Sequence, residues 1–97
     1  MANVQIGLTP ELVRGKAKDV RDAKTKYDDA MSSLRATILS LNEVWAGDSQ
    51  TAFVERYESV KPTLDNFSEM IENYASDLDF AASKMEATDQ ELTARSK

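Results

Sequence analysis

The sequence contains no cysteine and no histidine. Without cysteine, the chain can form neither a disulfide framework nor a thiolate metal site. Without histidine, it lacks the side chain that most often serves as a general acid or base and that activates serine and cysteine nucleophiles. We therefore predict that the protein is not an enzyme and that it has no catalytic residue, no metal site and no cofactor.

Glycine and proline are also scarce, with three and two copies respectively. So few turn residues do not support a many-stranded β fold, whereas 41% hydrophobic residues are too many for a disordered chain. A length of 97 residues suits one domain at most. We therefore expect residues 1–97 to form a single all-α domain.

Long hydrophobic runs are missing as well. No stretch approaches the ~20 apolar residues that a membrane-spanning helix needs, so we expect no stable membrane insertion. Residues 1–8 have no basic start, no long apolar core and no small-residue cleavage site, and they do not form a signal peptide. Taken alone, this pattern predicts a cytoplasmic protein.

Positive charge is nowhere unopposed in this chain, whose net charge is −5. The most basic stretch, residues 14–28, alternates lysine and arginine with three aspartates. A protein that binds nucleic acid concentrates unopposed positive charge on one surface. The sequence therefore argues against nucleic acid as a partner.

What the sequence does have is a regular helical pattern. Thr9 suits a helix N-cap and Pro10 suits the first helical position. Lys24, the one polar residue of the stripe that follows, is expected to extend toward solvent and pair with Asp28 one turn away. Steps of four and three residues relate the stripe positions, which are Val13, Ala17, Val20, Lys24, Tyr27, Met31, Leu34, Ile38, Leu41 and Trp45. This period predicts a helix over about 10–44.

A second stripe follows in the same rhythm, and eleven of its twelve positions are apolar. It predicts a helix over about 49–90, followed by a flexible C-terminal tail. Pro62 interrupts this helix and is expected to kink it rather than end it, because the stripe continues unshifted. The positions are Phe53, Tyr57, Val60, Leu64, Phe67, Ile71, Tyr74, Leu78, Ala81, Met85, Thr88 and Leu92.

The break between the two stripes is short and contains a glycine. Gly47 can supply the left-handed conformation that ends many helices, which places the turn at residues 45–48. So short a connection folds two helices back antiparallel, with Trp45 paired with Phe53. The predicted fold is therefore an antiparallel hairpin of two long helices.

Small residues recur every seven positions beside both stripes, at Ala23 and Ala30 in the first helix and at Ala75 and Ala82 in the second. Small side chains let a neighbouring helix approach closely, and a lone two-helix hairpin of this size is only marginally stable. We interpret these alanines as a face on which a homodimer forms a four-helix bundle. The alternative is that alanine is present only because it favours helix formation.

Trp45, Ala46 and Gly47 form a Trp-Xaa-Gly motif at the midpoint of the chain, between the two long stripes. In this arrangement the whole chain resembles the WXG family, the small ESAT-like proteins exported by type VII (ESX) secretion systems. The resemblance implies export of the folded protein without a cleaved signal peptide. It also implies that Trp45 and Gly47 form both the turn and a surface that the secretion machinery recognises.

The C-terminal region carries a second similarity to that family. Many members end with the pattern hydrophobic-x-x-x-Asp/Glu-x-x-hydrophobic-x-x-x-hydrophobic. Met85, Asp89 and Leu92 match its first three positions, whereas Ser96 occupies the last. The resemblance implies that these three residues form an export signal. The other interpretation of Met85 and Leu92 is that they continue the core stripe.

The resemblance thus implies a secreted WXG-type substrate, effector or adaptor that acts through protein–protein interaction and is cytoplasmic before export. Its expected partners are a second copy or a paralogous WXG protein, and the ATPase of the type VII machinery. The alternative is a cytoplasmic coiled-coil adaptor or chaperone that offers its apolar seam to another helix and is never exported.

Overall fold

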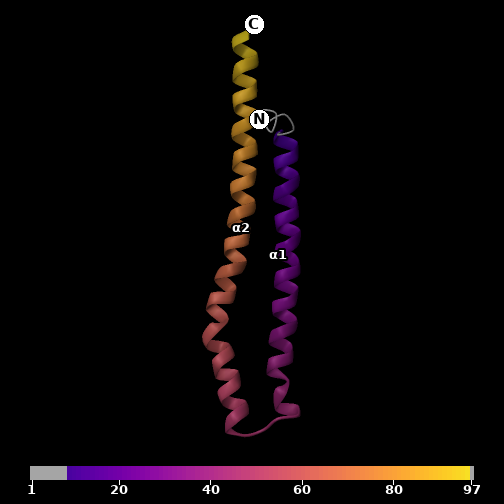
Figure 1. Ribbon diagram of the computed structural model, residues 1–97, viewed down its shortest axis with the longest axis vertical. Helices are drawn as coiled ribbons and strands as arrows, with labels where there is room; N and C mark the ends of the chain where they lie inside the picture. Colours follow the sequence, from indigo (N-terminus) through magenta and orange to yellow (C-terminus); the bar gives the residue numbers. More distant parts are fainter. Residues whose placement is uncertain (1–8, 97) are drawn as a thin grey trace, which may run out of the picture. The chain divides into compact units, whose positions relative to one another are not determined.

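The computed structural model describes the backbone of residues 9–96 and the side chains of residues 9–88. This part of the chain contains helix α1 (Pro10–Leu39), a 3-10 turn η2 (Leu41–Glu43) and helix α2 (Asp48–Ser96) (Figure 1). No strand occurs among these residues. The all-α fold predicted from the stripes is confirmed.

The start of α1 has the predicted cap. The Thr9 side-chain oxygen accepts a hydrogen bond from the Leu12 backbone N–H at 3.2 Å, and the Thr9 carbonyl accepts one from Val13 at 3.0 Å. Pro10 is then the first helical residue, where its missing N–H costs nothing. The cap thus satisfies one of the backbone donors that every helix start leaves without an intrahelical partner.

The turn is longer than the sequence predicted, because α1 ends at Leu39 and not near residue 44. The chain then tightens into η2, where the Val44 and Trp45 N–H groups both donate to the Leu41 carbonyl, at 3.0 and 2.8 Å. Gly47 has φ +107°, the left-handed conformation predicted for it. Among the described residues only Gly47 has a positive φ, so the reversal of direction depends on this glycine.

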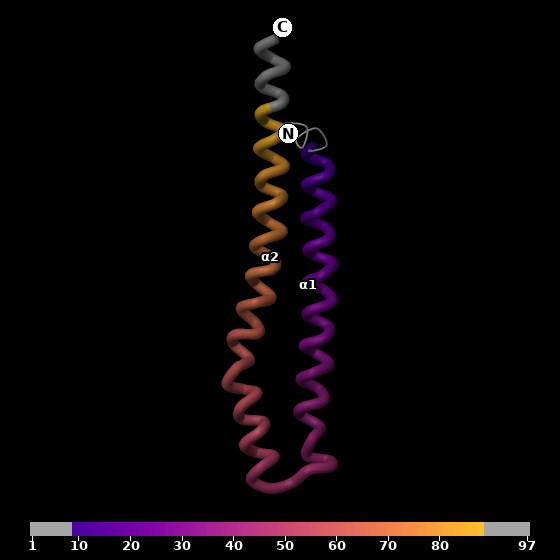
Figure 2. Tube along the Cα trace, in the orientation of Figure 1, coloured from indigo at the N-terminus to yellow at the C-terminus, as the bar shows by residue number. Residues whose placement is uncertain are grey.

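Helix α2 is also longer than predicted. It runs through Pro62 without ending, as expected, and the stretch that contains Pro62 is visibly curved (Figure 2). It continues to Ser96, beyond the end near residue 90 that the stripe predicted. Residues 91–96 contain no glycine or proline, and most of them favour helix formation, which gives the chain no reason to stop earlier.

The chain divides into two compact units. Unit 2 is Ala23–Met70 and contains the turn. In it the helices run antiparallel, with the Trp45 and Phe53 rings 5.8 Å apart and the Tyr27 and Phe67 rings 5.4 Å apart. The predicted pairing of Trp45 with Phe53 is confirmed.

Unit 1 combines the first part of α1, up to Asp22, with the part of α2 from Ile71 onward. Arg14 pairs with Glu86, and Arg21 pairs with Asp79 and Glu72, so the order of the contacts is reversed between the two helices. This reversal is the antiparallel arrangement again. Three alanines, Ala17, Ala75 and Ala82, have no exposed surface in the described structure.

A pair of alanine substitutions tests the backbone account of the turn. Gly47→Ala should lower the free energy of unfolding by about 1–2 kcal/mol, because an L-residue is strained in the left-handed region. A Cβ at Gly47 would meet no atom within 4 Å, so crowding adds nothing to this cost. Gly15→Ala, within α1 and equally uncrowded, should instead raise stability by about 1 kcal/mol. Denaturant unfolding of both variants measures the difference, and the same sign for both would refute this account.

Candidate protein-interaction site

The side chain of Trp45, in the turn, is partly buried and partly exposed to solvent. Its ring packs at 48° on the Phe53 ring, while the residue keeps 38% of its surface exposed. Its backbone N–H is fixed on the Leu41 carbonyl. On the other side of the turn, the Gly47 carbonyl accepts a hydrogen bond from the Thr51 N–H at 3.2 Å. Trp45 and Gly47, both singled out from the sequence, therefore lie in one small and well-fixed structure.

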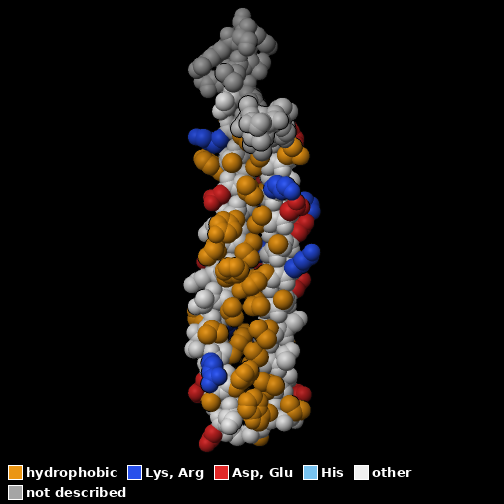
Figure 3. Space-filling model, viewed as in Figure 1, with side chains coloured by type: hydrophobic (Ala, Val, Ile, Leu, Met, Phe, Trp, Pro, Cys, Tyr) orange, Lys and Arg blue, Asp and Glu red, His pale blue; other side chains and the backbone are white. Residues whose placement is uncertain are grey.

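An exposed apolar row extends from this turn along α2 in unit 2. It consists of Phe53, Val60 and Phe67, spaced by seven residues and 38%, 45% and 48% exposed. A shallow groove of about 260 Å³ accompanies it, lined by Ile38, Phe53, Arg56, Tyr57 and Val60. Hydrophobic side chains gather along the helices on the face drawn in Figure 3. Contiguous exposed apolar surface of this kind marks a site of protein–protein contact.

This row was not expected from the sequence, because the heptad pattern predicts that all stripe residues belong to one seam. In α2 the stripe splits in two. Tyr57 and, seven residues on, Leu64 turn inward, whereas Phe53, Val60 and Phe67 turn outward. Small or flexible flanking residues, such as Ser68, take the inward places instead. Small side chains bring the helices closer together, so the seam rotates toward them. The run of small flanking residues was the signal that could have predicted this rotation.

The predicted dimer face also needs correction, because two of its four alanines are buried within the chain. Ala75 and Ala82 are completely buried within the described chain, so they have no surface to offer to a second copy. They belong to the packing of unit 1. Ala23 and Ala30 are exposed on α1 in unit 2, as is the nearby Leu34 at 39%. For Ala23 and Ala30 a role in dimerisation therefore stays a prediction.

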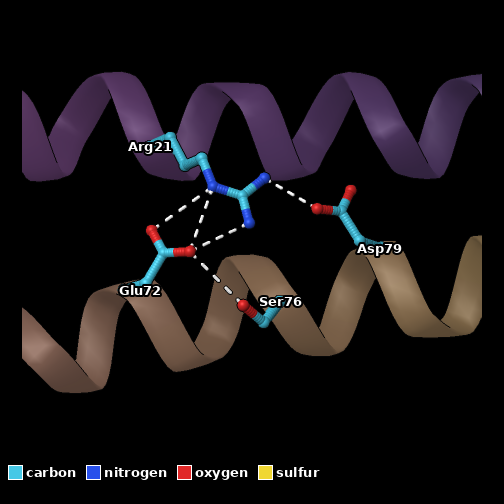
Figure 4. Close-up of polar contacts among 4 residues, drawn as sticks. All are labelled: Arg21, Glu72, Ser76 and Asp79. Carbon is cyan, nitrogen blue, oxygen red and sulfur yellow. Dashed lines mark hydrogen bonds and ion pairs between the residues drawn. The ribbon is translucent and has the colours of Figure 1, made fainter.

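Unit 1 has a polar side on which charged groups join the two helices. Arg21 donates to Glu72 through Nε and Nη2, and its Nη1 donates to Asp79 at 2.7 Å (Figure 4). Ser76 also donates to Glu72, at 3.3 Å. The hydrogen bonds from the two carboxylates raise the pKa of Arg21 above its ordinary value. One guanidinium thus connects two carboxylates that are seven residues, or about two helical turns, apart on the opposite helix.

Arg14 makes the second such contact in unit 1. Its two terminal nitrogens donate to the two oxygens of Glu86 at 2.8 and 2.6 Å, the two-point geometry that arginine forms with a carboxylate. These hydrogen bonds hold the pKa of Glu86 below its ordinary value and raise the pKa of Arg14. Both side chains remain about 40% exposed, so water and salt can reach the pair.

In unit 2 the polar contacts centre on Asp28 and Tyr27. Lys24 pairs with Asp28 at 2.9 Å, as predicted, and Ser68 donates to the same carboxylate at 2.5 Å. The Ser68 hydrogen bond, followed by that of Lys24, lowers the pKa of Asp28. Tyr27 donates to the Leu64 carbonyl at 2.9 Å, so its hydroxyl is satisfied within the fold.

A second cleft, also of about 260 Å³, lies beside these polar contacts in unit 2. Its charged side chains pair with one another or with their neighbours, as Lys61 does with Asp65 at 2.8 Å. No group of three or more side chains suited to a metal ion occurs among the described residues. The cleft is lined by Tyr27, Asp28, Met31, Ser32, Arg35, Tyr57, Lys61, Leu64, Asp65 and Ser68.

The residues matched to an export signal lie near the C-terminal end of α2. Met85 is half-buried in unit 1, next to the paired Glu86. The side chains of Asp89 and Leu92 lie outside the described residues, although the backbone there is helical. Because α1 begins only four residues before Arg14, the partner of Glu86, α2 extends past the start of α1 (Figure 1). None of the described helices is apolar enough over sufficient length to cross a membrane.

These features define a class of protein, a two-helix hairpin with an exposed apolar row beside a Trp-Xaa-Gly turn. The chain belongs to the WXG100 family, the proteins of 100 residues with WXG, whose model matches residues 5–90. It is 31% identical over 87 residues to Protein YukE of Bacillus subtilis, with 90% of each chain covered. It is 22% identical over 88 residues to the type VII secretion system extracellular protein A of Staphylococcus aureus, with 91% of each covered.

Solved structures of similar proteins have the same fold. EsxA of Geobacillus thermodenitrificans matches with a TM-score of 0.78 and 25% identity, over 91% of this chain and 97% of that one. The secreted protein EsxB of Bacillus anthracis matches with a TM-score of 0.76 and 27% identity, over 84% and 93%. The resemblance stated from the Trp-Xaa-Gly motif is thereby confirmed at the level of family and fold.

The Arg14–Glu86 pair makes stability depend on acid. Because the folded-state pKa of Glu86 is lowered, the pair stabilises the fold above the unfolded pKa of glutamate, about 4.3. That contribution is lost as the pH falls through the folded pKa. Arg14→Gln and Glu86→Gln should therefore each flatten the loss of stability on acidification.

Thermal unfolding of these variants between about pH 6 and pH 3 measures the effect. Lys16→Gln, which removes the same charge from an exposed position of α1, is the matched control and should follow the wild type. If Arg14→Gln follows the wild type as closely as the control does, the pair has no linked role.

Proposed function

We propose that this protein is a substrate of a type VII (ESX) secretion system, exported folded and without a cleaved signal peptide, which acts through protein–protein contacts. The observation that carries the proposal is the exposed apolar row of Phe53, Val60 and Phe67 beside the Trp45 turn. In a chain of the WXG100 family, with a relative named as a type VII extracellular protein, such a row has an evident use in partner recognition.

Within this proposal the partner on the apolar row is a second copy of the chain. Two hairpins that place their unit 2 rows together would form a four-helix bundle and cover side chains that one hairpin leaves in water. Leu34, Ala23 and Ala30 supply the neighbouring surface of α1. The small alanines would allow close approach of the second copy.

The remaining roles follow from the family pattern. Trp45 and Gly47 would form a surface that the secretion machinery recognises, in addition to forming the turn. Met85, Asp89 and Leu92 would be the export signal read by the secretion ATPase. The extension of the α2 backbone past the start of α1 supports this role, because α1 has no residue opposite that segment.

Dimerisation is tested with Val60→Arg. Val60 lines the groove and is 45% exposed, so arginine is tolerated in the single chain but places an unpaired charge in the dimer interface. Sedimentation equilibrium of the wild type at micromolar concentration should give twice the chain mass of 10.8 kDa. The variant should dissociate at least about tenfold more readily, equivalent to ~1.4 kcal/mol.

Ser59→Arg adds the same charge one position away, at an exposed residue outside the row, and serves as the matched control. It should sediment like the wild type. A wild-type chain that is monomeric and still melts cooperatively as a helix would rule out the homodimer. If Val60→Arg and Ser59→Arg weaken the dimer equally, the added charge alone, and not its position in the apolar row, causes the dissociation.

Export is tested with a chain that ends at Thr88, together with Asp89→Ala and Leu92→Ser. Because α1 reaches no further than about residue 90 of α2, truncation should cost less than ~1 kcal/mol of stability. Secretion into the culture supernatant should nevertheless fail, while a cytoplasmic marker shows that the cells are intact. Melting curves of each variant separate lost export from lost folding.

Secretion of the truncated chain at the wild-type level would refute the signal at Met85, Asp89 and Leu92. Failure of the wild-type chain to appear in the supernatant would refute export itself. That second result would instead favour a cytoplasmic coiled-coil adaptor or chaperone that uses the same apolar row to bind another helix.

A further inference from the structure

The charged contacts of unit 1 form a regular ladder. Glu72, Asp79 and Glu86 follow one another at seven-residue intervals along α2, and Arg14 and Arg21 are seven residues apart on α1. Each arginine reaches the acidic row, with shortest distances of 2.6 Å to Glu86 and 2.7 Å to Asp79. We call these five residues the charge ladder.

The ladder joins helices whose apolar seam in unit 1 is only partly buried. The fully buried side chains there are alanines, which bring little apolar area to the seam, and the larger Val13, Val20 and Leu78 are half-buried. Unit 2 has two aromatic ring contacts, the buried Ile38 and Tyr57, and an Arg35–Glu58 pair at 3.5 Å. Closure of unit 1 therefore combines apolar contacts with the arginine–carboxylate contacts of the ladder.

Salt can reach the ladder because its side chains are only partly covered. Arg14, Glu86, Arg21, Glu72 and Asp79 each keep about 40% of their side-chain surface exposed. Exposed ion pairs contribute modestly and are weakened when the screening length falls to about 3 Å at 1 M salt. Asp79 on α2 and Glu11 on α1 are acidic, and their charges also raise the pKa of Arg14.

Met85 lies at the end of the ladder. It directly precedes Glu86 in α2, and its heptad position is the same as that of Tyr57 and Leu78, neither of which is exposed. Met85 is half-buried, and the Arg14–Glu86 pair joins α1 to α2 at the residue that follows it. A residue assigned to the export signal thus lies beside a contact between the two helices of unit 1.

We propose that the charge ladder is a latch that controls access to Met85. Unit 1 opens reversibly when the ladder is weakened, and the opening presents the full Met85 side chain to whatever reads the signal. The regulatory part of this inference rests on the proposed export role of Met85. The opening itself does not, so the two can fail separately.

The opening is measured by oxidation of the folded full chain with hydrogen peroxide, followed by peptide mass spectrometry. The thioether takes one oxygen atom from the peroxide, which is reduced to water, at a rate that follows exposure of the sulfur. Met31, half-buried in unit 2, reports opening elsewhere, and Met70, 42% exposed, reports the reactivity of the oxidant.

Arg14→Gln should raise the oxidation rate of Met85 about two- to fivefold, the range expected for loss of a partly exposed ion pair, and leave Met31 unchanged. Raising salt to about 1 M should have a similar effect on the wild type. Lys18→Gln is the matched control, because it removes the same charge and breaks the Lys18–Asp22 pair within α1 without touching α2. It should leave Met85 unchanged.

A Met85 rate that responds to neither Arg14→Gln nor salt overturns the latch. Equal acceleration of Met31 and Met85 also overturns it, because the whole hairpin would then be loosening. In secretion assays Arg14→Gln should increase the exported amount and Lys18→Gln should not. If Met85 becomes more reactive while export is unchanged, the regulatory role is refuted and the proposed export stands. If the wild type is not exported at all, the proposed function fails while the oxidation rates still decide the latch.

Discussion

Two helices that lie side by side can cover only part of the apolar surface that each presents, and this constraint governs the rest of the molecule. Helix α2 has a stripe wide enough for two neighbours but only one intramolecular partner. Its inward half, represented by Tyr57 and Leu64, packs on α1. Its outward half, represented by Val60 and Phe67, stays in water. The hairpin is thus folded and yet retains an exposed apolar surface, which supports the contact function proposed above.

The two units meet this constraint with different chemistry. In unit 2 the Trp45–Phe53 and Tyr27–Phe67 ring contacts hold the helices together next to the turn. In unit 1 alanines allow close approach, and Arg14 and Arg21 span the seam to reach carboxylates. Screening by salt weakens partly exposed ion pairs but does not weaken apolar contacts. The latch proposed for unit 1 relies on this difference.

Local signals predicted much of the fold because their physical causes are local. Thr9 caps α1, Gly47 adopts the left-handed conformation and Lys24 pairs with Asp28, each as expected from residues a few positions away. The element ends were less predictable. Helix α1 ends before the expected turn and is followed by η2, in which the Leu41 carbonyl accepts hydrogen bonds from both the Val44 and Trp45 N–H groups. Competition between two hydrogen-bonding patterns of similar energy decides such an end, and residue preferences alone do not resolve it.

The sequence by itself determined the helical period, the midpoint break, the antiparallel pairing of Trp45 with Phe53 and the membership in the WXG100 family. It also marked the alanines as important but assigned Ala75 and Ala82 to a partner. Only the tertiary structure decided which side of each stripe faces inward, since the rotation of a helix about its axis depends on the shapes of both surfaces at once. In unit 1 the side that faces inward includes Ala75 and Ala82, which are completely buried. In unit 2 it includes Tyr57 and leaves Phe53, Val60 and Phe67 exposed.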